Sequence, residues 1–435
     1  MSVFSRDEEG DFARGARAVV IFPDFGQDPS RDQQARLEEA VGLAEAIGID
    51  VVARQALTVR QPRAGSLIGM GQAEAIGDEI ERSGAELLIV DAALAPIQQK
   101  TLEEKLGVKV IDRTGLILEI FGERAATAEG RLQVELAHLD YQAGRLVRSW
   151  THLERQRGGF GFLGGPGETQ IEADRRLIRD RMAKLRKELE QVRRTRGLHR
   201  DRRQRAPWPV IALVGYTNSG KSTLFNRLTE SDVMAEDLLF ATLDPTMRGI
   251  ALPAIDKAIL SDTVGFVSDL PTQLVAAFRA TLEEVEAADL IVHVRDIAHP
   301  DSEAQRADVE QVLTELEVIG GEGGAPLIEA WNKIDLLSDA EIEAFRNEAA
   351  RRDDVVPISA LTGKGMGALR DLMTRSLQHG HHAETVTLSA GDGERQAWLH
   401  RNGEVLNQQL DGESLKMTVR MSGADWKRFH SAMAG

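Results

Sequence analysis

The sequence predicts a multidomain α/β protein, and three observations lead to that fold class. Apolar runs alternate with helical patterns through residues 17 to 112. Two long segments of helical periodicity follow between residues 116 and 205. A glycine-rich loop then stands between an apolar run and an amphipathic segment, within residues 210 to 228. The chain has 435 residues, which is enough for roughly three or four folded units.

We expect a small parallel α/β subdomain at residues 1–115. Its short apolar runs alternate with helical patterns, which is the order of strand–helix–strand units. The expected strands are 18–22, 49–53, 87–90 and 108–111, and the expected helices are 32–47, 72–83 and 97–106. The glycine-rich stretch Gly65–Gly71 has neither the lysine nor the spacing of a phosphate-binding loop, so we interpret it as a connection.

Residues 116–205 are expected to form a long antiparallel helical hairpin with a glycine-rich tip and a basic linker. Two apolar stripes with three- and four-residue steps predict its helices: Leu132, Leu136, Leu139, Ala143 and Leu146, then Ile171, Ile178, Met182, Leu185, Leu189 and Val192. The joining loop, 155–170, carries Arg155, Arg157 and two phenylalanines among many glycines. This composition suits insertion into an RNA cavity, and an idle hairpin tip is the alternative.

Charge is distributed unevenly along the chain. The formal net charge is −16, yet residues 145–205 hold 18 Lys and Arg against 8 Asp and Glu. One basic segment on an acidic body fits local contact with a polyanion such as RNA. A solvated helical face of mixed charge is the alternative.

The composition excludes several classes of protein. There is no cysteine, so disulfides and thiolate metal sites are excluded. No apolar run approaches membrane-spanning length, and the N-terminus has no signal-peptide pattern. We therefore expect a cytoplasmic protein without a membrane span, acting as a monomer.

A phosphate-binding loop is predicted where the apolar run Val210–Val214 ends, near the start of a domain placed at residues 206–378. Its residues are Gly215, Tyr216, Thr217, Asn218, Ser219, Gly220, Lys221, Ser222 and Thr223. Glycines let the backbone N–H groups turn inward around phosphates, and a lysine supplies positive charge to the outer phosphates. The hydroxyl of Ser222 can ligate Mg²⁺.

Three further motifs follow at the ends of expected strands, and they point to a guanine nucleotide. Asp262, Thr263, Val264 and Gly265 suit Mg²⁺ held through water and a γ-phosphate met by the glycine N–H. In the motif Asn332, Lys333, Ile334 and Asp335, the aspartate can accept two hydrogen bonds from guanine, whereas adenine would leave it unpaired. The loop Ser359, Ala360 and Leu361 offers a backbone N–H to the guanine O6.

The order and spacing of these motifs predict a Ras-like P-loop G domain that hydrolyses GTP to GDP and phosphate. Its first switch should lie in Phe240, Ala241, Thr242, Leu243, Asp244, Pro245 and Thr246. Thr242 or Thr246 would close onto Mg²⁺ and the γ-phosphate. Lys221, Thr242 and Gly265 are the expected catalytic residues, with Ser222 and Thr242 as metal ligands.

Two positions refine the expected chemistry. Phe266 stands where Ras-like enzymes carry a water-orienting glutamine, so hydrolysis should be slow until something else completes the site. Phe266 could equally be a packing residue. Asn218 is similar to the asparagine with which glutamine-free GTPases ligate K⁺, and its alternative role is to brace the loop.

A small α/β C-terminal domain is expected at residues 379–435. Strand-like segments at 386–388 and 415–421 alternate with helical ones at 394–406 and 424–429. His379, His381 and His382 lie in the polar stretch 378–383, which we interpret as an exposed linker rather than a metal site.

Over nearly its whole length the chain resembles the HflX family of GTPases. The residues Gly164–Glu172 with Asp174–Arg176 match that family's glycine-proline-glycine-glutamate-threonine-glutamine element, and Arg124–Leu136 resembles the stretch upstream. The phosphate loop and Phe240–Asp244 also match, which favours Thr242 over Thr246. The family's arginine before the glycine-proline-glycine run is Gly164 here, and the loop at Gly69–Gly71 lacks the usual basic residue.

The resemblance implies binding to the large ribosomal subunit and its RNA, with the hairpin tip reaching toward the peptidyl-transferase region. It also implies GTP-dependent splitting of stalled or idle ribosomes under stress, and hydrolysis stimulated by ribosomes. An RNA-binding assembly or quality-control module with a slow timer GTPase is the alternative. A regulatory G protein acting on a non-ribosomal protein is a third hypothesis.

Overall fold

A computed structural model describes most of the chain. The described residues are 15–26, 31–156, 166–203, 208–230, 240, 246–268, 284–316, 318–319, 325–379, 381–412, 414–422, 426 and 429–430. Only the backbone is described at 146–156, 166–172, 174, 193–203, 379, 381–382 and 404. The chain divides into two compact units, the first made of residues 1–197, 236–244 and 268–279, and the second of residues 198–235, 245–267 and 280–435.

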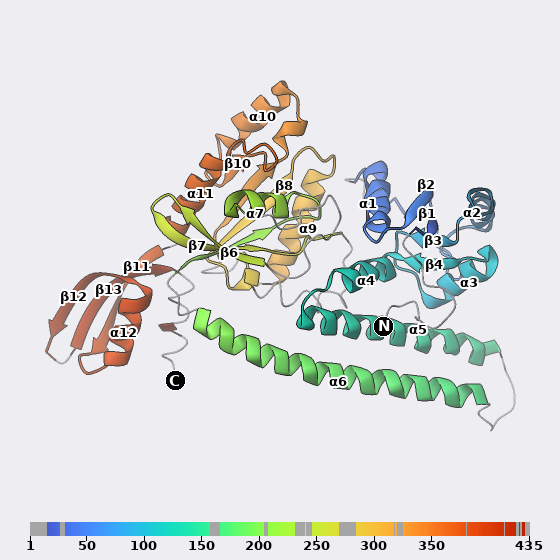
Figure 1. Ribbon diagram of the computed structural model, residues 1–435, viewed down its shortest axis with the longest axis horizontal. Coiled ribbons are helices and arrows are strands. Elements are labelled where there is room, and N and C mark those ends of the chain that lie inside the picture. The colour runs from blue at the N-terminus through green and yellow to red at the C-terminus, as the bar shows by residue number, and fades with distance from the viewer. Residues whose placement is uncertain are drawn as a thin grey trace. The chain divides into compact units, whose positions relative to one another are not determined.

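The first unit is built on a parallel sheet with the strand order β2-β1-β3-β4. Its elements follow the chain as β1 (Arg17–Asp24), α1 (Gln33–Glu45), β2 (Asp50–Thr58), α2 (Met70–Ser83), β3 (Leu87–Val90), α3 (Pro96–Leu106), β4 (Lys109–Asp112), α4 (Arg113–Arg124), α5 (Ala128–Gln156) and the greater part of α6 (Pro166–Arg203). Figure 1 shows α1 beside this sheet in blue and α4 in teal. The four expected strands and three expected helices are confirmed, with ends that differ by a few residues.

The central strands β1 and β3 form because their side chains are mostly apolar and buried on both faces, whereas the edge strand β2 is mostly exposed or half-buried. Every residue of β3 is buried, as expected for a central parallel strand covered by helices on both sides. Aspartates begin two of the helices: Asp32 accepts from the backbone N–H of Ala35, and Asp112 accepts from that of Gly115. Helix α4 was not predicted, because its residues Gly115–Leu118 are buried without a polar stripe to mark a period.

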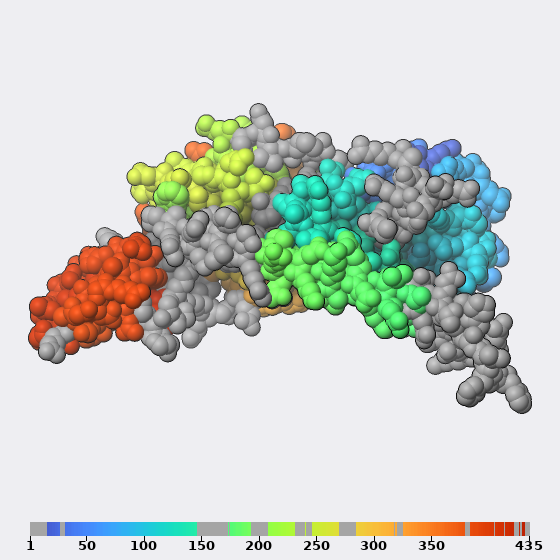
Figure 2. All heavy atoms as spheres, turned by 60° about the horizontal axis from the view of Figure 1, so that its bottom comes forward, coloured from blue at the N-terminus to red at the C-terminus, as the bar shows by residue number. Residues whose placement is uncertain are grey.

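Helices α5 and α6 form the expected antiparallel hairpin (Figure 1). Met182, Leu185 and Leu189 of α6 are buried, and Arg181 donates a 2.7 Å hydrogen bond to Glu135 of α5. Helix α6 begins at Pro166, four residues before the end of the predicted joining loop, because proline fits the first turn of a helix. The described part of α6 lies at the surface in Figure 2.

The second unit contains a six-stranded sheet with the order β10-β9-β8-β5-β7-β6, in which only β6 is antiparallel to its neighbour. Its elements are β5 (Val210–Val214), α7 (Lys221–Thr229), β6 (Thr246–Leu252), β7 (Ile255–Asp262), β8 (Leu290–Asp296), α9 (Ser302–Glu315), β9 (Leu327–Asn332), the 3₁₀ helix η1 (Ile334–Leu336), α10 (Asp339–Ala349), β10 (Val355–Pro357) and α11 (Met366–His379).

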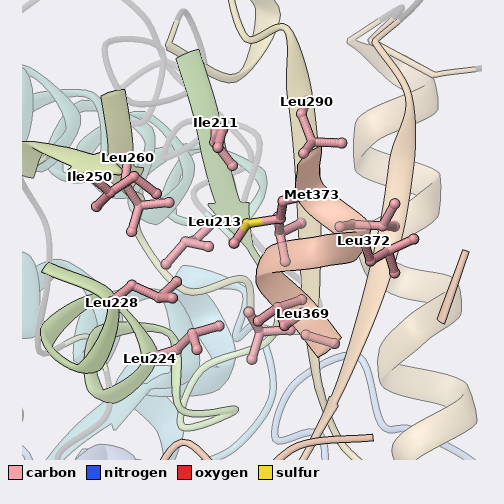
Figure 3. Close-up of a cluster of buried hydrophobic side chains, with 14 of the residues drawn as sticks. Ile211, Leu213, Leu224, Leu228, Ile250, Leu260, Leu290, Leu369, Leu372 and Met373 are labelled. Carbon is pink, nitrogen blue, oxygen red and sulfur yellow. The ribbon is translucent and has the colours of Figure 1, made fainter. Parts of the chain in front are cut away.

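The core on one face of this sheet explains where α7 and α11 lie. Leu224 and Leu228 of α7 and Leu369 and Met373 of α11 pack over the strand residue Leu213 (Figure 3). A second cluster forms on α10 with Trp331 of β9. Burying these apolar side chains fixes the loops that leave the strands, since each burial contributes on the order of 1.5–3 kcal/mol.

The C-terminal part is a small α/β structure with an antiparallel sheet of order β11-β13-β12. Its elements are β11 (His381–Ser389), α12 (Gly393–Asn402), β12 (Glu404–Asp411) and β13 (Ser414–Ser422). The predicted helix 394–406 was too long, because β12 begins at Glu404. The predicted linker 378–383 was wrong in its backbone, since α11 runs to His379 and β11 starts at His381.

Across the part of the chain that the structure describes, none of the helices is both long enough and apolar enough to cross a membrane.

Candidate nucleotide-binding site

The parallel strands of the six-stranded sheet bring four predicted motifs to one edge. Strands β5, β7, β9 and β10 all run in the same direction, so their carboxyl ends lie on the same side. The phosphate loop leaves β5, Asp262 ends β7, Asn332 ends β9, and Ser359 follows β10. Motifs separated by up to 146 positions in the sequence, from Gly215 to Leu361, therefore share one site. Ligands of open α/β sheets bind at such an edge.

Three positions of the site require glycine, because a Cβ atom there would lie too close to a neighbouring atom. A Cβ on Gly215 would lie 2.2 Å from the carbonyl oxygen of Val294, and one on Gly220 would lie 2.2 Å from Nδ2 of Asn332. Gly220 also has a φ of +95°, which side chains disfavour. A Cβ on Gly265 would lie 2.8 Å from the side chain of Thr217. The backbone thus packs against neighbouring residues at these three positions, which cannot accept a side chain without displacing them.

Lys221 begins α7 and is buried. Its Nζ donates to the carbonyl oxygens of Gly215 at 3.1 Å and Tyr216 at 2.8 Å. Burial lowers the pKa of Lys221 to about 8, while the carboxylate of Asp262 raises it. The Lys221 ammonium is therefore held by two carbonyl oxygens of the phosphate-binding loop.

The residue pair Ser222 and Asp262 offers oxygen ligands. The Ser222 hydroxyl donates to Oδ2 of Asp262 at 2.8 Å, and Asp262 is buried. A hydroxyl and a carboxylate are the ligand types that Mg²⁺ prefers. These two side chains fit a Mg²⁺ ion at the phosphate end of the site.

The segment after Gly265 is joined to the phosphate loop through the backbone. Phe266 donates its N–H to Gly215 O at 3.0 Å and accepts from the N–H of Thr217 at 2.7 Å. Its side chain is buried. Phe266 is therefore a packing residue, and an apolar ring of this kind cannot orient a water molecule. Thr263 donates to Leu213 O at 2.6 Å and ties the same segment to β5.

Asn332 connects three motifs with a single amide. Its Nδ2 donates to Ser219 O at 2.8 Å, and its Oδ1 accepts the N–H of Ala360 at 2.9 Å. The side chain is buried. Because one amide satisfies both the phosphate loop and the 359–361 loop, the two loops are held at a fixed separation.

The rest of the predicted base site lies around Asn332. Lys333 has a φ of +66°, and its ammonium pairs with Asp296 at 2.8 Å. Asp335 lies in η1, two residues further on. Ser359 organises its loop, since its hydroxyl accepts from Thr362 N–H at 3.0 Å and its carbonyl from Gly363 N–H at 2.8 Å. Asp296 was not predicted, because no motif marks it.

The first switch is described only in part. Phe240 belongs to the first unit, where its ring meets that of Phe121 edge to face at 4.8 Å. Thr246 begins β6 and is the strand partner of Asp262. Thr242 lies outside the described residues, together with Ala241, Leu243, Asp244 and Pro245. The choice between Thr242 and Thr246 stays a prediction.

Asn218 lies exposed at the outer part of the phosphate loop with a φ of +57°. Asparagine tolerates this left-handed conformation better than most residues, so the backbone alone gives a reason for it. K⁺ binding by Asn218 stays a prediction.

Three protein-family models match consecutive parts of the chain. Residues 34–122 match the N-terminal region of a GTP-binding GTPase, residues 124–203 match its middle region, and residues 210–333 match a 50S ribosome-binding GTPase. A GTPase named HflX from Magnetococcus marinus is 49% identical over 391 residues, covering 90% of this chain and 89% of the relative. The chain belongs to the HflX family of GTPases.

A second relative agrees with this membership. The HflX GTPase of Escherichia coli K12 is 42% identical over 415 residues, which cover 95% of each chain. GTP is therefore the substrate, and the chain is an enzyme that hydrolyses it. A GTP-binding protein of Sulfolobus solfataricus, solved with GDP, is 25% identical with a TM-score of 0.45, covering 84% of this chain and 99% of that one.

Proposed function

We propose that this GTPase associates with the large ribosomal subunit and, in its GTP-bound form, splits stalled or idle ribosomes into subunits. The observation that carries the proposal is the HflX similarity over 90–95% of the chain, together with the match of residues 210–333 to a 50S ribosome-binding GTPase. We place this activity in the cytoplasm, with a single copy of the chain acting on each ribosome.

We infer a role for each residue of the candidate nucleotide site. Asp335 receives the guanine N1–H and 2-amino group, and the 359–361 loop donates to O6. Lys221 neutralises the outer phosphates, and Gly265 donates its N–H to the γ-phosphate. Ser222 and a threonine of the first switch hold Mg²⁺, with Thr242 preferred to Thr246. Bound Mg²⁺ would neutralise charge that develops on the phosphates.

Hydrolysis is slow in the isolated protein, because Phe266 is apolar and buried and cannot orient the attacking water. Ribosome contact completes the site and speeds the reaction. A K⁺ ion held by Asn218 would supply part of the missing positive charge. Turnover rates in KCl and in NaCl at equal ionic strength test this; equal rates would leave Asn218 with the bracing role alone.

The hairpin supplies the surface that meets RNA. Met182, Leu185 and Leu189 of α6 are buried. Its exposed side chains include basic residues, two acidic residues and one large apolar residue: Arg176, Arg179, Lys184, Arg186 and Lys187, then Asp180 and Glu190, and Leu177. An outward basic face on a protein of net charge −16 favours a local phosphate contact. Residues 157–165 of the predicted tip lie outside the described residues.

A density-gradient run tests the proposal. Intact ribosomes are sedimented with the protein and a non-hydrolysable GTP analogue, against a GDP control. We expect free subunits, with the protein on the large one, only with the analogue. Intact ribosomes that carry the protein would contradict splitting while leaving ribosome binding. Binding only to precursor subunits would favour the assembly module.

A matched pair of variants tests the hairpin. Replacing Arg179 and Arg186 by alanine should weaken large-subunit binding about tenfold and lower the salt dependence of the affinity by about two phosphate contacts. Replacing Arg346, an exposed arginine of α10, should change neither. Unchanged, salt-insensitive binding of the double variant would favour a protein partner instead of RNA.

A further inference from the structure

A side chain outside every recognised motif contacts the 359–361 loop, which we call the base loop. Arg227 lies in the last turn of α7. Its Nε donates to Ala360 O at 3.1 Å, and its Nη2 donates to Leu361 O. One planar guanidinium thus holds two consecutive carbonyls of the loop that is assigned to the guanine O6. Arginine has the fork geometry for this, whereas a lysine ammonium would act as a single point.

The same loop is held from its other side by Asn332. Ala360 donates its N–H to Asn332 Oδ1 at 2.9 Å, and its carbonyl receives Arg227. Residue 360 is therefore fixed through both polar groups of its backbone, one bonded to β9 and one to α7. Internal hydrogen bonds shape the loop, but these two contacts set where it stands.

Helix α7 joins the two ends of the nucleotide site. Lys221 is its first residue and bonds the phosphate loop, while Arg227 lies six residues later and bonds the base loop. Six residues of helix extend about 9 Å. The buried residues Leu224, Phe225 and Leu228 anchor this helix in the core. The helix therefore holds the phosphate-binding loop and the 359–361 loop at a fixed separation.

We propose that Arg227 is a positioning residue for guanine recognition, which holds the 359–361 loop at the distance from which a backbone N–H reaches O6. The inference rests on the proposed assignment of guanine to this site. It predicts that Arg227 matters only for nucleotides that carry O6, because its effect is exerted through the loop and not through the phosphates.

Three diphosphates separate this role from a general structural one. GDP carries O6, N1–H and the 2-amino group. Inosine diphosphate carries O6 and N1–H without the amino group, and 2-aminopurine riboside diphosphate carries the amino group without O6 or N1–H. Dissociation constants of the full-length protein are measured for wild type, Arg227→Met and Arg227→Lys, with Arg346→Met of α10 as the matched control.

Arg227→Met should weaken GDP and inosine diphosphate by about tenfold and leave 2-aminopurine riboside diphosphate unchanged. Arg227→Lys should restore part of the loss, and Arg346→Met should change nothing. An equal loss for all three nucleotides, or none for GDP, overturns the inference. Should Arg227→Met fail to fold, Arg227→Lys carries the same test. A wild-type protein that does not prefer GDP would instead overturn the guanine assignment itself.

Discussion

Glycine-rich loops accompany both the parallel sheet of the first unit and the mixed six-stranded sheet of the second, and only the loop after β5 requires its glycines. In the loop after β5, Cβ atoms on Gly215 and Gly220 would both lie 2.2 Å from a neighbour, and Gly220 has a positive φ. In the first unit, a Cβ on Gly65 or Gly71 meets nothing within 4 Å. The loop after β5 needs glycine because it packs closely against its neighbours, whereas the Gly65–Gly71 loop contains glycines without needing them at Gly65 and Gly71.

The difference teaches how to interpret glycine in a sequence. A phosphate loop is tight because its N–H groups must converge, and convergence forces the backbone against neighbouring strands. The Gly65–Gly71 stretch lacks that closure, which agrees with its interpretation as a connection.

Replacing one glycine in each loop is the strongest test of this comparison. Gly220→Ala should weaken GDP binding about a thousandfold, roughly 4 kcal/mol, because it strains the backbone and displaces Asn332. Gly71→Ala, on the exposed first turn of α2, should leave binding unchanged and stabilise the fold by up to about 1 kcal/mol. Calorimetric titration with GDP measures both, and near-equal losses would refute the distinction.

Buried carboxylates sharpen the comparison of the two sheets. In the six-stranded sheet, Glu329 accepts from Arg295 and Arg352 at 2.6 Å and from Trp331 Nε1 at 2.8 Å. These donors lower the pKa of Glu329 to about 2, against the effect of burial. Glu329→Gln should cost about 3 kcal/mol at neutral pH. Trp331 fluorescence during urea unfolding measures it, and Glu343→Gln on exposed α10 is the control.

The pH dependence of that loss has a fixed sign. Since the folded pKa is depressed, the contribution of Glu329 is complete above the unfolded value near 4.5 and disappears as pH falls toward 2. Wild type and Glu329→Gln should therefore converge in stability near pH 2. A constant difference across this range would contradict the assignment.

Lys221 distinguishes the two glycine-rich loops chemically, because only the one after β5 ends in a lysine. With its pKa lowered to about 8, binding a phosphate must restore the proton at higher pH. GDP affinity should fall as pH rises through 8, by up to about tenfold per pH unit. Titration calorimetry in two buffers of different ionisation enthalpy should show proton uptake at pH 9. Absence of uptake would show that Lys221 is fully charged before binding.

Asp112, one of the buried carboxylates of the first unit, should be less sensitive to the loss of one donor. Asp112 accepts from Tyr141 Oη at 2.6 Å, from Arg145 at 2.8 Å, and from the backbone N–H groups of Leu94 and Gly115 at 3.0 and 2.8 Å. Tyr141→Phe removes one donor of four and should cost about 1 kcal/mol in urea unfolding. A loss as large as that of Glu329→Gln would show that Tyr141 carries more of this cluster than the geometry indicates.

The convergence of the four motifs on one edge of the sheet could be predicted, because each motif is recognised by its local spacing after an apolar run. Lys221 and Ser359 follow β5 and β10, and Asp262 and Asn332 are the last residues of β7 and β9. Parallel strands end at one edge of a sheet. Arg227 could not be predicted, since one arginine on a helix has no pattern until the fold places it beside residue 360.

The parts of the fold that were not predicted, α4 and β12, do not have one apolar face and one polar face. Helix α4 is buried nearly all round, so it shows no amphipathic stripe. Strand β12 is exposed over most of its length and carries polar residues that read as the tail of a helix. The start of α6 at Pro166 did carry a signal, because proline favours the first turn.

Helix α7 also limits how the chain can change length. One residue inserted between Lys221 and Arg227 would turn the later part of the helix by about 100° and move it by about 1.5 Å. The arginine would then leave the 359–361 loop, and Leu228 would leave the core. Loops that leave the opposite edge of the sheet face no such restriction, because none of their residues has to keep a fixed distance from the nucleotide. In this family, insertions and deletions should therefore accumulate at that opposite edge and spare the nine residues of α7.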